Sequence, residues 1–313
     1  MRNSEVGYLN TMLQEVEQVI CSAAQWEEKI EKILARSKRF DYSNFYFAGN
    51  DNKTLYPLEK IFRLLMDAIK TEEVYDKTSK LAWCFRGFFG DDPNNFYPLK
   101  MSDDDCDFLA QKLRIIDYQN CGMTVIASYS PHPQKERFAS LLIDYADKSK
   151  GKEMNWAMCG DACESLAFLK ANQLESIDCL FRHIDDGGCD GYPHDQCVFA
   201  LRYFPEHHDK IATTLLKFIN SEIENDWGSL DDVCTRVEFF KTLMLHIKTK
   251  QQARYAIDVI KRYVKLSYKG SSFDIAKEIR KDLSSSLHVD GMQLFQTYNF
   301  ELLVLGYLNI LAE

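Results

Sequence analysis

The residues best suited to chemistry lie close together between His183 and Cys197. This segment holds two histidines, two cysteines and four aspartates, which are the side chains that bind zinc and harder metal ions. Their spacing matches no standard zinc knuckle, and the glycines at 187, 188 and 191 favour a flexible link. We therefore predict an exposed loop that binds no metal. The alternative is a metal-assisted hydrolase that uses Asp185, Asp190 and His194.

A second polar group follows Pro205, where Glu206, His207, His208 and Asp209 occupy the expected start of a helix. Consecutive side chains point about 100° apart around a helix, so His207 and His208 cannot easily face one metal ion. An acid at this end of a helix is favoured by the helix dipole. We interpret the group as a polar helix start. The functional alternative is that its histidines contact a partner with an affinity that changes around pH 6.5.

The chain carries no strong catalytic or cofactor motif. The chain contains no CxxC, HExxH, GxGxxG or GxSxG pattern, and no GxxxxGK followed by serine or threonine. Zinc-ribbon, zincin, dinucleotide-binding, P-loop and hydrolase-elbow interpretations therefore lose their usual support. We expect no catalytic residue and no cofactor, although an enzyme built from scattered residues would pass this test.

Charge is distributed unevenly along the chain. The sequence carries 38 basic and 47 acidic residues, a net charge of −9, which disfavours nucleic acid as a partner. Residues 248–282 are the exception, because ten lysines and arginines outnumber four acids there and three tyrosines lie among them. We interpret this basic segment as the exposed face of two helices. The alternative is that it binds nucleic acid.

The elements that must position these residues are expected to be helices. Apolar residues recur every three or four positions, and the first such stripe predicts one long helix from Glu5 to Arg36. Ser102 with Asp105 forms a capping box, which predicts a helix start at that point. The aspartates at 103, 104, 105 and 107 do not match a calcium-binding loop, since its glycine and final glutamate are absent.

Helix pairs recur between Asn120 and Val264. Four pairs can be aligned on the second helix of each, with spacings of 38, 36 and 44 residues, at Leu142, Leu180, Leu216 and Ile260. Turn-forming residues separate the two helices of each pair, at Pro131, Asn172, Pro205 and Thr249. A helix pair that cannot bury both of its faces alone stacks on its neighbours, so this period predicts a helical repeat array.

The repeat length and the placing of these links resemble HEAT or armadillo repeats. The resemblance covers about half of the chain. It implies an all-α fold, a right-handed stack of antiparallel helix pairs or α-solenoid, with a helical N-terminal region over 1–118. Repeats and C-terminal capping helices would then occupy 119–313. A generic α-helical bundle stays open as the alternative.

Length and composition indicate a folded globular chain. The 313 residues are 46% hydrophobic and 27% charged, close to the average of globular proteins. Residues 1–17 lack the basic and apolar regions of a secretory signal, and no apolar run reaches the roughly 18 residues that a membrane span needs. Ten dispersed cysteines fit buried thiols in a reducing compartment. We therefore expect a cytoplasmic protein with no membrane partner.

These observations favour a protein-binding module over an enzyme. Stacked repeats offer a long surface to a partner, and the acidic chain suits a basic one. In this respect the chain is similar in character to immunity proteins that neutralise bacterial toxins by direct binding. The oligomeric state stays open. The residues that we expect to contact the partner are Asp185, Asp186, Asp190, Tyr192, His207 and His208.

Overall fold

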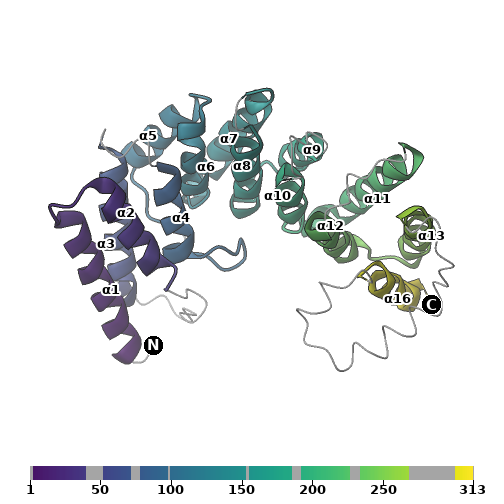
Figure 1. The fold of residues 1–313 in the computed structure, drawn as a ribbon, viewed down its shortest axis with the longest axis horizontal. Coiled ribbons are helices and arrows are strands. Elements are labelled where there is room, and N and C mark those ends of the chain that lie inside the picture. The colour runs from purple at the N-terminus through teal and green to yellow at the C-terminus, as the bar shows by residue number, and fades with distance from the viewer. Residues whose placement is uncertain are drawn as a thin grey trace. The chain divides into compact units, whose positions relative to one another are not determined.

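Figure 1 shows the computed structural model of the chain, which describes residues 3–39, 52–71, 78–97, 99–152, 155–184, 192–225, 233–267 and 300–312. Regular structure within these residues is helical, and the predicted all-α class is confirmed for them. None of the helices in these described ranges combines the length and apolarity that crossing a bilayer requires.

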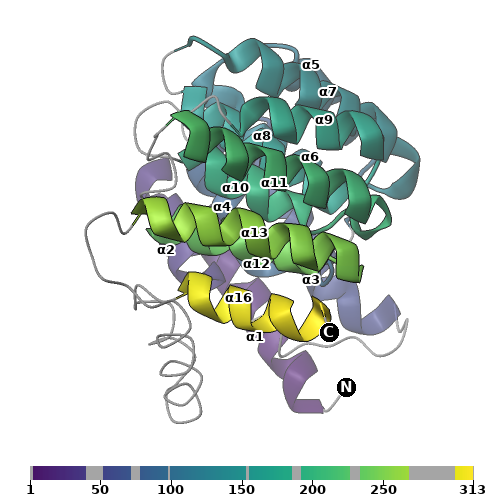
Figure 2. The same cartoon turned by 90° about the vertical axis from the view of Figure 1, so that its right-hand side faces the viewer.

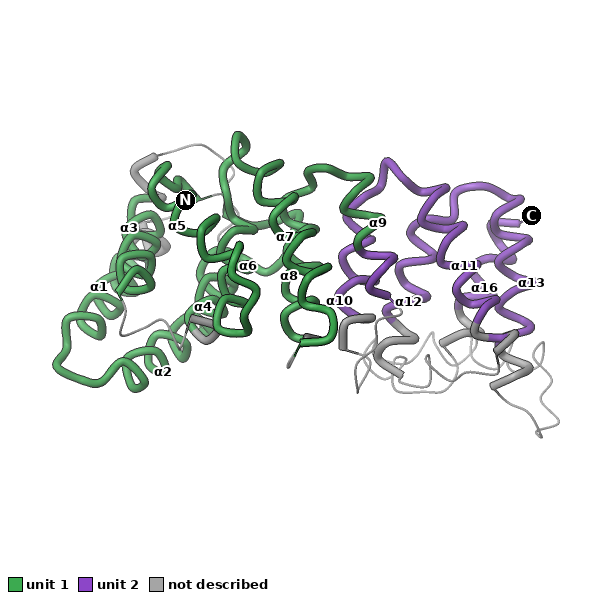
Figure 3. Tube along the Cα trace, turned by 90° about the horizontal axis from the view of Figure 1, so that it is seen from above, with its two compact units in different colours: residues 1–179 green, residues 180–313 purple. Residues whose placement is uncertain are grey.

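The chain divides into two compact units, Met1–Cys179 and Leu180–Glu313 (Figure 3). The first contains α1 (Asn3–Cys21), α2 (Trp26–Ser37), α3 (Asn52–Ile69), α4 (Thr78–Phe89), α5 (Asp103–Leu113), η3 (Tyr118–Asn120), α6 (Cys121–Ala127), η4 (His132–Gln134), α7 (Lys135–Ser149) and α8 (Asn155–Leu169). The boundary between the units lies within α9 (Gln173–His183). The second contains α10 (Tyr192–Leu201), η5 (Pro205–His207), α11 (His208–Asn225), α12 (Val233–His246), α13 (Lys250–Ser267) and α16 (Phe300–Ala312).

The predicted single helix from Glu5 to Arg36 is wrong, because the chain forms α1 and α2 with a break between them. Ser22 ends α1, since its backbone N–H and its hydroxyl both donate to the carbonyl of Val19. Side chains of α2 then hold this helix against α1. Lys29 donates to the carbonyl of Ile20 at 2.9 Å, where the dipole at a helix C-terminus favours a cation. The apolar pattern did not reveal the break between the helices, because both helices have buried residues at the same three- and four-residue spacing.

In the first unit, α2, α4, α6 and α8 contact one another in turn, while α5 packs on α6 and α7 on α8. Buried aromatic rings fill the space around α4: Phe85 lies 6.2 Å from Phe62 and 5.5 Å from Phe89, between ring centroids. Close packing of α2 on α4 depends on Gly87, where a Cβ atom would lie only 2.7 Å from Cβ of Ser37.

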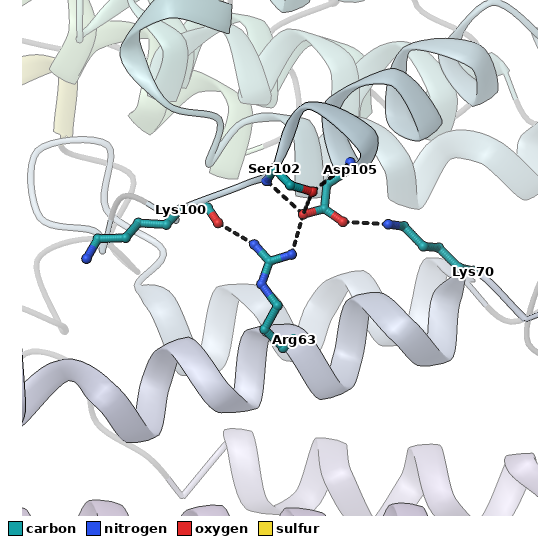
Figure 4. A network of polar contacts seen from close by, with 5 residues as sticks. All are labelled: Arg63, Lys70, Lys100, Ser102 and Asp105. Atoms are coloured by element: carbon teal, nitrogen blue, oxygen red, sulfur yellow. Dashed lines mark hydrogen bonds and ion pairs between the residues drawn. The ribbon is translucent and has the colours of Figure 1, made fainter.

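The capping box of α5 is confirmed, and its carboxylate is also the centre of an ion network (Figure 4). The hydroxyl of Ser102 accepts from the backbone N–H of Asp105, whose side chain in turn accepts from the backbone N–H of Ser102. Arg63 and Lys70 reach the same carboxylate from α3 and the residue after it, and Arg63 also donates to the carbonyl of Lys100. The Asp105 side chain is only 2% exposed. The network therefore fastens the start of α5 to α3.

Burial by itself would raise the pKa of Asp105, but hydrogen bonds from Lys70, Ser102 and Arg63 outweigh it and hold that pKa well below its ordinary value. Asp105 is consequently a charged structural carboxylate. The interpretation of this aspartate run as helix-start acids, and not as a calcium loop, agrees with these contacts.

The four turn residues predicted from the sequence lie at the ends of helices, as expected. Pro131, Asn172 and Thr249 each lie between two successive helices, and Pro205 begins η5 between α10 and α11. Asn172 adopts the left-handed backbone conformation, with φ of 44°, that asparagine tolerates in tight turns. The aligned second-helix residues are all buried, at Leu142, Leu180, Leu216 and Ile260.

In the second unit, α11, α13 and α16 lie in successive rows (Figure 2), while α12 contacts α10, α11 and α16. Thr249 starts α13 with a second capping box, because its hydroxyl accepts from the backbone N–H of Gln252 and the Gln252 side chain accepts from the backbone N–H of Thr249. The rows in this unit bury apolar residues of each helix, Val259 and Leu308 among them.

Candidate functional site

Most of the site predicted from sequence lies outside the described side chains. Asp185, Asp186 and Asp190 are outside the described residues, and Tyr192 is described only by its backbone at the start of α10. The same holds for the hydrolase alternative, since His194 has a described backbone and no described side chain. The interpretation of that loop therefore stays a prediction.

His207 and His208 are both described and half-buried, and they belong to different elements. His207 ends η5 and His208 begins α11. Nδ1 of His208 lies 3.1 Å from Nδ1 of His246, the last residue of α12. The sequence-based site missed His246. The two histidines are 38 residues apart in no local motif, and the packing of α11 on α12 brings them together.

The first unit contains a second cluster, which we term the acid–arginine cluster: Arg86, Tyr129, Asp161, Glu164 and Phe168. Arg86 comes from α4, Asp161, Glu164 and Phe168 from α8, and Tyr129 from the turn after α6. These three helices pack consecutively, so the cluster crosses the layer that they form.

Arg86 is buried between rings and beside one acid. Its side chain is 5% exposed, and its guanidinium carbon lies 3.8 Å from the ring centroid of Phe168 and 5.7 Å from that of Tyr129. One terminal nitrogen lies 3.6 Å from a carboxylate oxygen of Glu164. Among the described residues, neither terminal nitrogen makes a hydrogen bond. Cation–π contact and one long ion pair therefore hold this charge inside the unit.

Asp161 is poised to take up or release a proton near neutral pH. Burial and the nearby charge of Glu164 raise its pKa to about 7, although Arg86 and a hydrogen bond with the Cys121 thiol act in the opposite direction. Burial, with the charge of Asp161 in second place, raises the pKa of Cys121 to about 12. The carboxyl group can therefore hold or move a proton, while the neighbouring thiol stays protonated and is a poor nucleophile.

Large aromatic side chains are exposed on α4, which carries Arg86, and on the neighbouring η3. Trp83 lies one turn before Arg86 on α4 and is 50% exposed. Tyr118 is 41% exposed and belongs to η3, which contacts α4, α6 and α8. Burial raises the pKa of Tyr118, and the charges of Cys121 and Asp161 raise it further, which places its hydroxyl in the field of that acid. An acidic group and two exposed rings thus belong to one region of the first unit.

Sequence reasoning missed this cluster because its members look like ordinary helix residues. One signal was available. Arg86 is the only charged residue in the stretch 81–89, and Asp161 and Glu164 are the only charged residues in 155–169. A lone charge in an otherwise apolar helix must be buried with a partner or face a functional surface.

Comparison of the chain with known protein families, with curated proteins and with solved structures finds no match.

Proposed function

We propose that the chain is a HEAT-like helical-repeat protein that works by binding another protein and not by catalysis. The confirmed links and the buried register support the repeat interpretation. The order of helix contacts within each unit supports it too, because alternate helices contact one another in turn.

The observation that carries the proposal is the exposure of Trp83 and Tyr118 beside the acid–arginine cluster. Tryptophan and tyrosine are enriched among the residues that dominate binding energy at protein interfaces. Trp83 stands on a helix whose next turn is anchored by buried Arg86, so binding would order little additional backbone. A rigidly mounted ring of this kind suits a hot-spot anchor.

The chemistry of the cluster favours binding over nucleophilic catalysis. The thiol of Cys121 is protonated at physiological pH, and the charge of Arg86 is covered by rings. Trp83 and Tyr118 are the exposed side chains here, and Asp161 is half-buried. Such a surface suits a partner that offers an apolar group beside a cation.

The partner that we propose is basic. The chain has a net charge of −9, and three of its acids, Asp185, Asp186 and Asp190, lie in one glycine-rich segment. Acids around an interface speed the association of a basic partner more than they strengthen the complex. Neutralisation of a basic toxin is one specific form of this function.

The experiment is quantitative affinity capture from a native lysate with three forms of the chain. The test variant is Trp83→Ala with Tyr118→Ala, and the matched control is Tyr307→Ala, which removes a ring that is 47% exposed in the second unit. We expect one protein to be retained by the wild type and the control and lost from the double variant. Equal retention by all three forms would contradict the proposed surface.

Measuring association rates tests whether the acidic segment speeds the binding of the partner. Reversal of charge at Asp185, Asp186 and Asp190 together should slow association with the captured partner by about tenfold at low salt, and by much less at high salt. Circular dichroism checks that the helices are retained. An unchanged association rate would remove this segment from the interface.

A further inference from the structure

The second unit brings two imidazole rings together at a point where two helices meet. His208 begins α11 and His246 ends α12, and their Nδ1 atoms face each other at 3.1 Å. The ring centroids are 5.1 Å apart with an angle of 57° between the ring planes. His246 is 1% exposed, whereas His208 is half-buried, so the pair is reached from the His208 side.

The contacts of His246 fix the position of its proton. Its Nε2 lies 3.0 Å from the carbonyl oxygen of Leu201, which can only accept a hydrogen bond. Nε2 therefore carries the hydrogen, and Nδ1 of the neutral ring presents a lone pair toward His208. Burial is the main reason that the pKa of His246 falls to about 4, so this ring is neutral at physiological pH.

We propose that His208 and His246 bind a divalent transition-metal ion of the kind that imidazole prefers, such as zinc or nickel, through their two Nδ1 atoms. Metal–nitrogen distances of about 2.0 to 2.1 Å place two ligand nitrogens about 2.8 to 3.4 Å apart, from octahedral to tetrahedral angles. The observed 3.1 Å lies within that range. His208 would move its own proton to Nε2, and the two rings would turn so that both Nδ1 lone pairs point at the ion.

The surroundings of the pair resemble those of a metal ligand. A histidine that binds a metal usually donates its other N–H to a carboxylate or a backbone carbonyl, as His246 does to Leu201. The charges of Glu206 and Asp209 act on His208 and would attract a cation, while Lys248 acts on both rings and would repel it. Water would complete the coordination on the exposed side.

Neighbouring His207 supplies the matched control. It stands next to His208 in sequence, but it belongs to η5, and the Nδ1 atom that lies 3.1 Å from His246 is that of His208. We would titrate the untagged full chain with Ni²⁺, because nickel favours imidazole while the ten cysteines favour softer ions. Isothermal titration calorimetry in a non-chelating buffer would compare the wild type with His208→Gln and His207→Gln.

We expect one Ni²⁺ per chain with an affinity that falls at least tenfold in His208→Gln and changes less than twofold in His207→Gln. Loss of equal size in both variants, or no saturable binding to the wild type, would overturn the proposal. Circular dichroism would verify that both variants fold.

A second variant tests the site without touching its ligands. Lys248 is exposed, and its charge opposes a cation between the two rings. Lys248→Gln should therefore raise the Ni²⁺ affinity severalfold at low ionic strength, and the gain should shrink in high salt. A Lys248→Gln variant that binds Ni²⁺ no more tightly than the wild type would place the ion elsewhere.

Discussion

Replacement of Asp161 by asparagine should stabilise the protein at neutral and alkaline pH. Burial and Glu164 raise the pKa of this carboxyl to about 7, far above the value of about 3.9 in an unfolded chain. Between these two values the folded state holds a proton that the unfolded state has released. Stability therefore falls as pH rises from about 4 to about 7, and a neutral asparagine at this position escapes that loss.

The size of the expected gain in stability follows from the pKa shift of Asp161. About three pKa units at 1.36 kcal/mol each set an upper bound of roughly 4 kcal/mol. Asp161 is half-buried, so solvent screening reduces that figure, and we expect a gain of about 1 to 2 kcal/mol at pH 8. At pH 4 the carboxyl of the folded wild type is protonated, and the two proteins should differ little. The hydrogen bond from the Cys121 thiol survives in the variant, because the amide oxygen also accepts.

Urea denaturation at pH 4 and pH 8, followed by circular dichroism, measures the difference. Asp144→Asn is the control, because that acid forms an exposed ion pair with Lys148 and should change stability by less than about 0.5 kcal/mol at either pH. An Asp161→Asn protein that is less stable than the wild type at pH 8 would refute the reasoning. So would a difference between the two proteins that does not depend on pH.

Three further predictions concern packing inside each unit, taken by itself. Asp105→Asn should cost about 2 to 4 kcal/mol of unfolding free energy at pH 7, measured by urea denaturation. The variant should also lose less stability on acidification, because a carboxylate with a lowered pKa stabilises the fold only while it is ionised. Exposed Asp103→Asn is its control. Gly87→Ala should lower the thermal midpoint and cost about 1 to 3 kcal/mol of unfolding free energy. Gly7→Ala in α1 places its methyl group in open space and should add up to about 1 kcal/mol. Leu216→Ala should cost about 2 to 5 kcal/mol in chemical denaturation, and a loss below about 0.5 kcal/mol would show that the register is wrong.

Sequence reasoning succeeded where local physical chemistry decides the structure. The capping box at Ser102 and the turn at Asn172 depend on a few neighbouring residues, and both are found as predicted. Burial of Leu180 and Leu216 followed from helical periodicity. The break between α1 and α2 was missed because its cause is tertiary: Lys29 and Arg36 hold α2 against α1 through Ile20 and Glu15, which lie nine and 21 residues away.

The candidate site could not be found in the same way. The acid–arginine cluster joins Arg86 to Glu164, which are far apart in the sequence and belong to no local motif. The raised pKa of Asp161 arises from burial, which depends on how α4, α6 and α8 pack. His208 was selected from sequence, but its contact with His246 needed the register of α11 against α12.

The most direct test of the central claim is the affinity of the captured partner for Trp83→Ala with Tyr118→Ala, measured by surface plasmon resonance beside the wild type and Tyr307→Ala. Hot-spot rings typically contribute 2 kcal/mol or more, so binding to the double variant should weaken by at least about thirtyfold, chiefly through faster dissociation. The Tyr307→Ala control should bind as the wild type does. Wild-type affinity in the double variant would contradict the claim that this region of the first unit binds another protein.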